Sequence, residues 1–258
     1  MSEGKKEILL GDCLELMKDI PNGSIDMILC DLPYGTTACK WDTIIPFDKL
    51  WEQYERIIKP NGAIVLFGSE PFSSLLRCSN LKLFKYDIIW DKVSKTNSMN
   101  AKYQVLKQHE IISIFYKKAG KYYPIKTTGV KWTRGGNKKI DKTSQYYQQA
   151  GDVILGKSTH DIDDSKLPTS ILTISNADKT KRWHPTQKPV TLFEYLIKTY
   201  TNEYELVLDN CAGSGTTAIA CLNTNRQFIV MEQEPNYFEK IKKRVGDFNK
   251  KFEQQILF

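Results

Sequence analysis

The stretch LVLDNCAGSGTTAIACL, Leu206 to Leu222, decides the expected fold. It begins with an apolar run typical of a buried strand and ends with an apolar segment typical of a helix. Gly213 and Gly215 lie between the two, where they allow a tight turn and a close approach of a ligand to the backbone. A strand, a glycine-rich turn and a helix in this order are typical of nucleotide-binding α/β proteins. The alternative interpretation is a plain strand–helix turn whose glycines serve packing.

Strand-like and helix-like segments alternate along most of the remaining chain. Short apolar runs predict strands at residues 7–12, 25–31, 63–68, 86–90, 110–118 and 227–234. Apolar residues at helical spacing predict helices at residues 13–20, 46–60, 71–80, 184–200 and 235–252. Pro60, Asn61 and Gly62 would close the second of these helices. The alternation predicts an α/β fold with a doubly wound, mostly parallel sheet.

A second motif, Asp31-Leu32-Pro33-Tyr34, follows the apolar run of residues 25–30. Pro33 cannot donate a backbone hydrogen bond, so the strand is expected to end there. Ligands of open α/β sheets bind outside the carboxyl ends of the strands, so this turn and the glycine loop are expected to face one cleft. The Asp31 carboxylate and the Leu32 carbonyl would accept hydrogen bonds from the exocyclic amine of a base, and Tyr34 would stack on its ring. A strand-end turn with a buried tyrosine is the alternative.

Two acidic residues near the glycine loop indicate the kind of ligand. Glu232 follows Gly213 by 19 positions, which suits an acidic residue that binds ribose hydroxyls. The third glycine of the dinucleotide fingerprint is absent, and Asp209 at the strand tip would repel a phosphate. The same carboxylate would attract a cationic ligand. These features favour S-adenosylmethionine, with its amino group and sulfonium, over a dinucleotide.

Positive charge is concentrated in one segment of the 258-residue chain. The formal net charge is +7, and residues 117–182 contain 14 lysines and arginines against 6 acidic residues. This glycine-containing segment also interrupts the α/β alternation. It is either a solvated insertion or a phosphate-binding surface, because clustered lysine and arginine release counterions from a polyanion. The expected organisation is a catalytic half at 1–116, an insert at 117–182 and a cofactor-binding half at 183–258.

The composition does not favour membrane, secreted or metal-binding proteins. No apolar stretch approaches the length of a membrane helix, and the first residues lack the apolar core of a secretory signal. The six cysteines form no CxxC pair, and the three histidines show no spacing typical of metal ligands. We therefore expect a cytoplasmic protein with reduced cysteines, no metal site and no membrane partner.

The motifs together resemble those of the β-group amino-methyltransferases of DNA, whose signature is Asp/Asn/Ser-Pro-Pro-Tyr/Phe. That signature stands here as Asp31 to Tyr34, and Asp209 to Thr217 is similar to the family's cofactor motif Asp-x-Phe-x-Gly-Ser-Gly-Thr-Thr. HPTQKP, His184 to Pro189, resembles the segment that lines the methionine end of the cofactor. The motif order resembles the circularly permuted arrangement of this group. The resemblance implies a Rossmann-like, mostly parallel, seven-stranded sheet with an inserted target recognition segment.

The resemblance also implies a role for each matching residue. The residues that would hold S-adenosylmethionine are Asp12, Thr186, Gln187, Lys188, Asp209, Ala212, Gly213, Ser214, Gly215 and Glu232. The catalytic residues would be Asp31, Leu32, Pro33 and Tyr34. DNA would contact the insert, where an arginine could read a guanine edge and lysines would bind phosphates. These DNA-binding residues are Arg134, Lys138, Lys139 and Lys142.

Some positions depart from the family pattern or match it only loosely. Leu32 replaces the first proline of the signature, and Cys211 replaces the phenylalanine that often packs on the cofactor adenine. Neither change removes a reacting group. Phe67 is expected either in the cofactor pocket or in the core. His109 and Glu110 resemble a target-base pocket motif.

The expected function is site-specific methylation of adenine N6 in DNA, on a base that is flipped out of the duplex. An aspartate at position 31 is typical of the adenine enzymes. Serine is commoner among the cytosine N4 enzymes, which are the main alternative. A non-catalytic DNA-binding relative is the alternative from another class. A homodimer and a companion restriction endonuclease are left open as partners.

Overall fold

The computed structural model describes residues 4–35, 42–96, 98–128, 165–176 and 187–256, except for the side chains of residues 128, 165 and 251–256. The chain divides into two compact units. The smaller unit is Lys126–Pro168, in which strands β6 (Thr127–Thr128) and β7 (Ser165–Lys166) form an antiparallel pair. The larger unit, Met1–Ile125 with Thr169–Phe258, contains the main sheet and the cavity described below.

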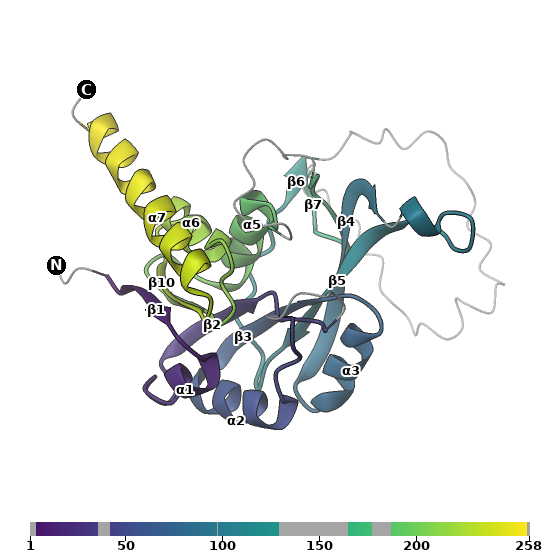
Figure 1. The fold of residues 1–258 in the computed structure, drawn as a ribbon, viewed down its shortest axis with the longest axis horizontal. Helices are drawn as coiled ribbons and strands as arrows, with labels where there is room; N and C mark the ends of the chain where they lie inside the picture. The colour runs from purple at the N-terminus through teal and green to yellow at the C-terminus, as the bar shows by residue number, and fades with distance from the viewer. Residues whose placement is uncertain (1–3, 36–41, 97, 129–164, 177–186, 257–258) are drawn as a thin grey trace, which may run out of the picture. The chain divides into compact units, whose positions relative to one another are not determined.

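A sheet forms the centre of the larger unit (Figure 1), and its strands lie in the order β1-β10-β9-β2-β3-β5-β4-β8. Strand β5 runs antiparallel to β3 and β4, and the other neighbours are parallel. The strands are β1 (Lys6–Leu10), β2 (Ile25–Cys30), β3 (Ile58–Gly68), β4 (Phe84–Thr96), β5 (Lys107–Phe115), β8 (Ile171–Thr173), β9 (Leu206–Asp209) and β10 (Gln227–Glu232). The predicted mostly parallel α/β sheet is confirmed. Within the described ranges it has eight strands rather than seven, because the short β8 extends it beside β4.

Helices cover both faces of the sheet (Figure 1), because apolar side chains of buried strands point alternately to the two faces. Met27 and Leu29 of β2 pack in one apolar cluster with α5, α6 and α7. Ile28 and Cys30 pack in a second cluster with α1, α2 and α3. The helices are α1 (Cys13–Met17), α2 (Phe47–Ile57), α3 (Phe72–Ser79), α5 (Val190–Tyr200), α6 (Thr216–Asn223) and α7 (Pro235–Ile256), with a short 3₁₀ turn, η1, at Ser98–Asn100.

The parallel pairing of β2 with β9 joins the two parts of the chain that carry the motifs. Met27 pairs with Val207 and Ile28 with Leu208, although each pair is separated by 180 positions in sequence. Parallel strands present their carboxyl ends at the same edge of a sheet. The turn after β2 and the glycine loop after β9 therefore begin next to one another.

The second predicted helix ends earlier than the sequence suggests. α2 ends at Ile57, and Ile58 has an extended backbone (φ −72°, ψ 136°). Residues 60–62 therefore lie inside strand β3 and do not close the helix. Pro60 disfavours helical geometry at Lys59, the residue before it, so the helix cannot continue through that position and ends two residues earlier. Gly62 allows a close approach of two strands, since a Cβ there would lie 2.7 Å from the carbonyl oxygen of Asp26.

The segment predicted as an insert, residues 117–182, is broader than the smaller unit. That unit begins at Lys126 and ends at Pro168. Strand β8 falls within the predicted insert but pairs with β4 in the main sheet. Residues 129–164 lie outside the described residues.

A buried carboxylate joins β2 to β9 at the amino ends of the strands, away from the cavity. Asp26 is 4% exposed and accepts hydrogen bonds from Lys59 Nζ at 2.7 Å, Lys121 Nζ at 3.2 Å and the Leu206 amide at 3.1 Å. Burial raises the pKa of Asp26, but these hydrogen bonds and the charge of Lys59 outweigh it and lower the pKa below its usual value.

We expect Asp26→Ala to lower the free energy of unfolding by about 2–4 kcal/mol, because it leaves the Leu206 amide without its acceptor and removes the carboxylate that Lys59 and Lys121 contact. Because the pKa of Asp26 is lowered in the folded state, its contribution is present above the unfolded pKa and is lost as the pH falls from there through the lower folded pKa. Urea unfolding at several pH values measures both effects. Asp19→Ala removes an exposed carboxylate and serves as the control. Equal stabilities of the two variants near neutral pH would contradict this role.

Candidate functional site

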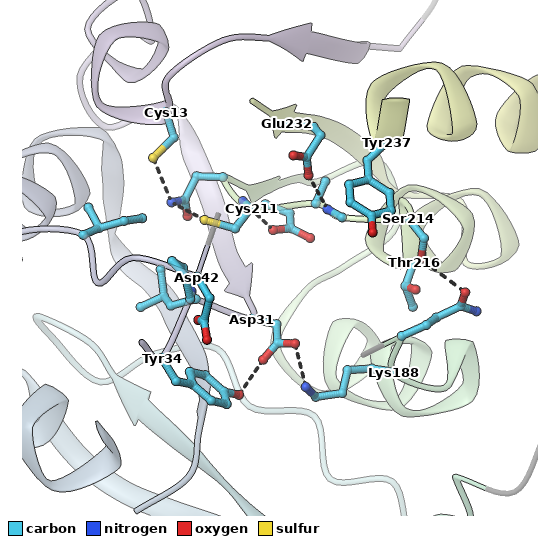
Figure 2. Close-up of a pocket in the computed structure, with 18 of the residues that line it drawn as sticks. Cys13, Asp31, Tyr34, Asp42, Lys188, Cys211, Ser214, Thr216, Glu232 and Tyr237 are labelled. Atoms are coloured by element: carbon cyan, nitrogen blue, oxygen red, sulfur yellow. Dashed lines mark hydrogen bonds and ion pairs between the residues drawn. The ribbon is translucent and has the colours of Figure 1, made fainter. Parts of the chain in front are cut away.

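A cavity of about 730 Å³ opens at the carboxyl ends of β2 and β9 (Figure 2). Its walls come from the turn after β2, the glycine loop after β9, the end of β10, the turn before α1, the β4–β5 hairpin and the residues just before α5. This volume is in the range of sites that enclose small-molecule ligands. The two motif turns, which the sequence predicts to share a cleft, thus line one cavity.

The glycine loop has a backbone that only glycine adopts readily. Gly213 and Gly215 have φ angles of +54° and +75°. A Cβ at position 215 would lie 2.8 Å from Cγ2 of Ile241 in α7. Arg244, also in α7, donates from Nη1 to the carbonyl oxygen of Ser214 at 2.9 Å. Helix α7 therefore supports the loop from one side, while Gly213 and Ser214 face the cavity on the other.

Asp209, the last residue of β9, carries a buried carboxylate at the base of this loop. It is 3% exposed and accepts hydrogen bonds from the Cys211 amide at 3.1 Å and from the Thr217 hydroxyl. Burial raises the pKa of Asp209 to about 6, although the two hydrogen bonds oppose the rise. Near neutral pH the carboxylate is therefore mostly ionised and attracts a cation in the cavity.

Two further carboxylates are fixed in place by backbone amides. Glu232 accepts from the Gly213 amide at 2.8 Å and from the Glu234 amide at 2.9 Å, which holds the end of β10 against the glycine loop. Asp12 is the N-cap of α1 and accepts from two amides of its first turn, at 2.8 and 3.3 Å. Both side chains line the cavity.

The turn after β2 places a carboxylate and an aromatic ring next to one another. The Tyr34 hydroxyl donates to Asp31 Oδ1 at 2.5 Å, and the Tyr34 ring stacks on Phe72 with centroids 4.9 Å apart. Leu32 buries its side chain in the core, so the leucine in place of the family proline adds an apolar anchor to the turn. Pro33 lines the cavity together with Asp31 and Tyr34.

The residues just before α5 connect the two turns. The Ser214 hydroxyl donates to Gln187 Oε1 at 3.3 Å, and Lys188 donates from Nζ to Asp31 Oδ2 at 2.6 Å. Lys188 is 8% exposed. Burial lowers the pKa of Lys188, but Asp31 and Glu110 outweigh it and raise that pKa to about 12. In this structure Gln187 therefore contacts the glycine loop, whereas Lys188 contacts the turn after β2 (Figure 2).

The charges around the cavity fit a cationic ligand. The acidic residues that line it are Asp12, Asp31, Asp42, Glu110, Asp209 and Glu232, and the basic ones are Lys92, Lys95 and Lys188. S-adenosylmethionine has two positive groups and one carboxylate, so it complements this excess of negative charge.

Within the described ranges, no group of three or more histidine, cysteine or acidic side chains could hold a metal ion.

Most predicted site residues line the cavity, with a few exceptions. Gly215 supports the loop without lining the cavity, and Phe67 is fully buried in the core, stacked on Phe193. His109 is exposed, whereas Glu110 lines the cavity. Five predicted residues lie outside the described residues, and they are Arg134, Lys138, Lys139, Lys142 and Thr186.

Sequence reasoning missed several residues of the cavity wall. Lys92 of β4 is 5% exposed, and its signal is a lysine at a position where the strand pattern expects a buried apolar residue. Tyr237 lies in the first turn of α7, directly after the end of β10, and lines the cavity. Cys13 and Asp42 also line the cavity, but neither belongs to a motif that predicts a binding residue at its position.

Comparison with known proteins decides the family. The sequence model described as DNA methylase, which covers N6 and N4 methyltransferases, matches residues 25–243. The chain belongs to the DNA methylase family. The type II methyltransferase M2.MboI of Moraxella bovis is 26% identical, over 96% of this methylase and 93% of the relative. The DNA adenine methyltransferase YhdJ of Escherichia coli K12 is 28% identical, over 91% and 80% of the two chains.

Solved structures agree with this family. The crystal structure of an M1.HpyAVI–SAM complex superposes with a TM-score of 0.62 and 27% identity, over 92% of this methylase and 98% of that chain. The cytosine-N4-specific PvuII DNA methyltransferase gives a TM-score of 0.65 at 18% identity, over 92% and 85% of the two chains, and shows the shared fold. The predicted family and methyltransferase fold are confirmed, and so is S-adenosylmethionine as the cofactor of this family.

The methylase also offers a direct test of the glycine loop. We expect Gly215→Ala to lower the free energy of unfolding by about 1–3 kcal/mol and to weaken cofactor binding, because the added Cβ meets Ile241 and opposes the left-handed backbone. Thermal unfolding and calorimetric titration with S-adenosylmethionine measure the two effects. Gly246→Ala in α7 is the matched control, since a Cβ there meets nothing within 4 Å. If Gly215→Ala and Gly246→Ala have the same stability and the same cofactor affinity, α7 does not support the loop in this way.

The raised pKa of Asp209 predicts a pH dependence of cofactor binding. Protonation removes the negative charge, so the affinity for S-adenosylmethionine is expected to fall as the pH decreases through about 6. Asp209→Asn should bind more weakly near neutral pH and show a shallower pH dependence, as measured by calorimetry. A variant that keeps the full pH dependence would assign it to another group.

Proposed function

We propose that this methylase transfers a methyl group from S-adenosylmethionine to N6 of a specific adenine in DNA. The observation that carries the proposal is the convergence of Asp31, Tyr34 and the glycine loop on one cavity. The family supplies the coarser activity, which is methylation of an exocyclic amine of a DNA base at N6 or N4.

The turn after β2 suits an exocyclic amine. Such an amine is a poor nucleophile because its lone pair delocalises into the ring. In the proposal, the amine donates one hydrogen bond to the Asp31 carboxylate and one to the Leu32 carbonyl, and the base stacks on Tyr34. These contacts orient the amine and favour tetrahedral geometry at its nitrogen, so positioning and electrostatics supply most of the rate enhancement.

The opposite wall of the cavity would hold the cofactor. When bound, S-adenosylmethionine supplies an electrophilic methyl group on a positively charged sulfur. In the proposal, Asp209 attracts the positive charge, Glu232 binds the ribose hydroxyls, and Asp12 reaches the adenine ring of the cofactor. The target amine would gain positive charge as its bond to the methyl carbon forms, while the carbon–sulfur bond breaks and leaves its electron pair on the neutral thioether product. The amine would then release one proton to water. The Asp31 carboxylate stabilises that charge.

Two observations support adenine as the target base. An aspartate stands at position 31, and the relative of 28% identity from Escherichia coli is a DNA adenine methyltransferase. Cytosine N4 is the second candidate, because the cytosine-specific PvuII enzyme has the same fold. The serine that is commoner among cytosine N4 enzymes is not present at position 31, which is why adenine is preferred.

Methylation of a base in DNA also requires contacts between the protein and the duplex. A base in a duplex must leave the stack to reach the cavity, at a cost of a few kcal/mol. We assign the flanking contacts to the basic insert, with phosphate binding at Lys138, Lys139 and Lys142 and base reading at Arg134. The type II name of the Moraxella relative supports a companion restriction endonuclease for this chain too, and a homodimer stays part of the proposal.

The experiment that tests the function is mass analysis of nucleosides from genomic DNA incubated with the protein and S-adenosylmethionine. We expect N6-methyladenine, and sequencing of the same DNA would give the recognition site. N4-methylcytosine would keep the mechanism and replace the base. Cofactor binding without any methylated base would overturn the proposal.

We expect Asp31→Ala to reduce methyl transfer by at least about 100-fold while cofactor affinity changes by less than about threefold, because the carboxylate contacts the base and not the cofactor. Asp31→Asn keeps a hydrogen-bond acceptor without the charge, so its rate of methyl transfer should lie between that of the wild type and that of Asp31→Ala. Single-turnover assays and calorimetry separate these effects. Wild-type turnover in Asp31→Ala would remove Asp31 from the mechanism.

A further inference from the structure

The Asp31 carboxylate already has a cationic partner. Lys188 Nζ lies 2.6 Å from Asp31 Oδ2, while the Tyr34 hydroxyl occupies Oδ1 at 2.5 Å. The same ammonium lies 5.9 Å from the centroid of the Tyr34 ring and 5.4 Å from that of Phe67. Lys188 thus contacts both groups that the proposed function assigns to the target base.

A buried ammonium on Asp31 opposes catalysis if it stays there. The target amine becomes positively charged during transfer, and a neighbouring cation cancels the favourable field of the carboxylate. Removing Lys188 to water is also costly, because both charges are largely buried. A second acceptor inside the cavity would solve both problems.

Glu110 supplies that acceptor. Its Oε2 lies 3.2 Å from Lys188 Nζ, yet this buried oxygen receives no hydrogen bond of good geometry from any residue in the described part of the chain. Its other oxygen, Oε1, accepts from Lys92 Nζ at 3.1 Å. Burial raises the pKa of Glu110, but the charges of Lys188 and Lys92 outweigh it and lower the pKa, so this carboxylate is ionised.

We propose that Lys188 occupies the place of the target amine in the DNA-free enzyme and moves onto Glu110 when the base arrives. This inference rests on the proposed function of Asp31. Lys188 changes partner by a short displacement, because both carboxylates already lie within 3.2 Å of its ammonium. The charges of Lys92 and Lys188 balance those of the two carboxylates before and after this movement. Lys188 and Glu110 are positioning residues that act through Asp31.

The movement of Lys188 from Asp31 to Glu110 gives the Asp31 carboxylate two different electrostatic environments. Burial raises the pKa of Asp31, and the charge of Lys188 opposes the rise, so the lysine favours the ionised carboxylate before the base binds. Once Lys188 pairs with Glu110, the Asp31 charge faces the amine alone. The groups that act electrostatically on Asp31 are then Tyr34 of the same turn, Lys188 and Glu110, with Asp209 across the cavity.

A double-mutant cycle tests the exchange of partners. Glu110→Gln removes the second acceptor, so Lys188 should stay on Asp31, and kcat should fall about tenfold or more. Lys188→Met removes the cation, so Asp31 is free for the base but protonates more readily. The Lys188→Met/Glu110→Gln double variant should therefore turn over faster than Glu110→Gln at alkaline pH, which favours the ionised form of Asp31 when the lysine is absent. If the reduction in kcat of the double variant equals the product of the reductions in the two single variants, the proposal is overturned.

The pH profile separates this role from a purely structural one. In Lys188→Met, the acidic limb of the kcat/KM profile should move to higher pH by about one unit or more, because Asp31 loses its cation. Lys188→Arg keeps the charge and should leave the limb close to that of the wild type. Lys59→Met breaks a similar lysine–aspartate contact, of 2.7 Å, outside the cavity, and should not move the limb. An unmoved limb in Lys188→Met would contradict the pairing.

A measurement without cofactor or DNA keeps this test independent of the proposed function. A carboxyl with a raised pKa in the folded state destabilises the protein as pH rises through that pKa. The Tm of cofactor-free Lys188→Met should therefore fall more steeply than that of the wild type between about pH 4 and 8. Parallel curves would refute the Lys188–Asp31 interaction. If the curves diverge but no DNA is methylated, the proposed function fails and the ion pair stands.

Discussion

The parallel pairing of β2 with β9 is the constraint on which the site depends. It brings the end of an early strand beside the end of a late one, so that two turns from distant parts of the sequence open into one cavity. The pairing is secured at its amino end by Asp26, which accepts a hydrogen bond from the first residue of β9. Above it, the buried side chains of β2 pack against helices on both faces. The strands thus act as a rigid base, and the chemistry is left to their ends.

Charge in the cavity is arranged so that no carboxylate stands without support. Asp209 and Glu232 are held by backbone amides of the glycine loop and its neighbours, while Asp31 and Glu110 share Lys188, and Glu110 also contacts Lys92. Amide donors orient a carboxylate without cancelling its charge, so the side of the cavity with Asp209 and Glu232 attracts a cation. Lysines do cancel that charge, so the side with Asp31 and Glu110 is nearly neutral in this structure. The two halves of the cavity therefore differ in electrostatics although both contain carboxylates.

Local patterns in the sequence predicted much of this architecture. The strand–glycine–helix segment at Leu206 to Leu222 and the turn from Asp31 to Tyr34 carry their conformational signals within a few residues, so their positions at strand ends could be expected. The Lys188–Asp31 contact spans 157 positions and has no local signal. The same holds for β8, whose three residues become a strand only because β4 offers a free edge. The early end of α2 shows the reverse case. The sequence pattern predicts that the helix extends to Pro60, whereas this proline already disfavours helical geometry at Lys59.

The sheet order has a consequence for synthesis of the chain. Strand β2 is made early, and one of its two neighbours, β9, is made about 180 residues later. Until then β2 has an unpaired edge, although its six residues are wholly buried in the finished fold. An apolar strand with open hydrogen-bonding groups invites pairing with other chains. The arrangement that joins the two turns therefore leaves one edge of β2 unpaired while about 180 further residues are made, which favours aggregation of the nascent chain during that time.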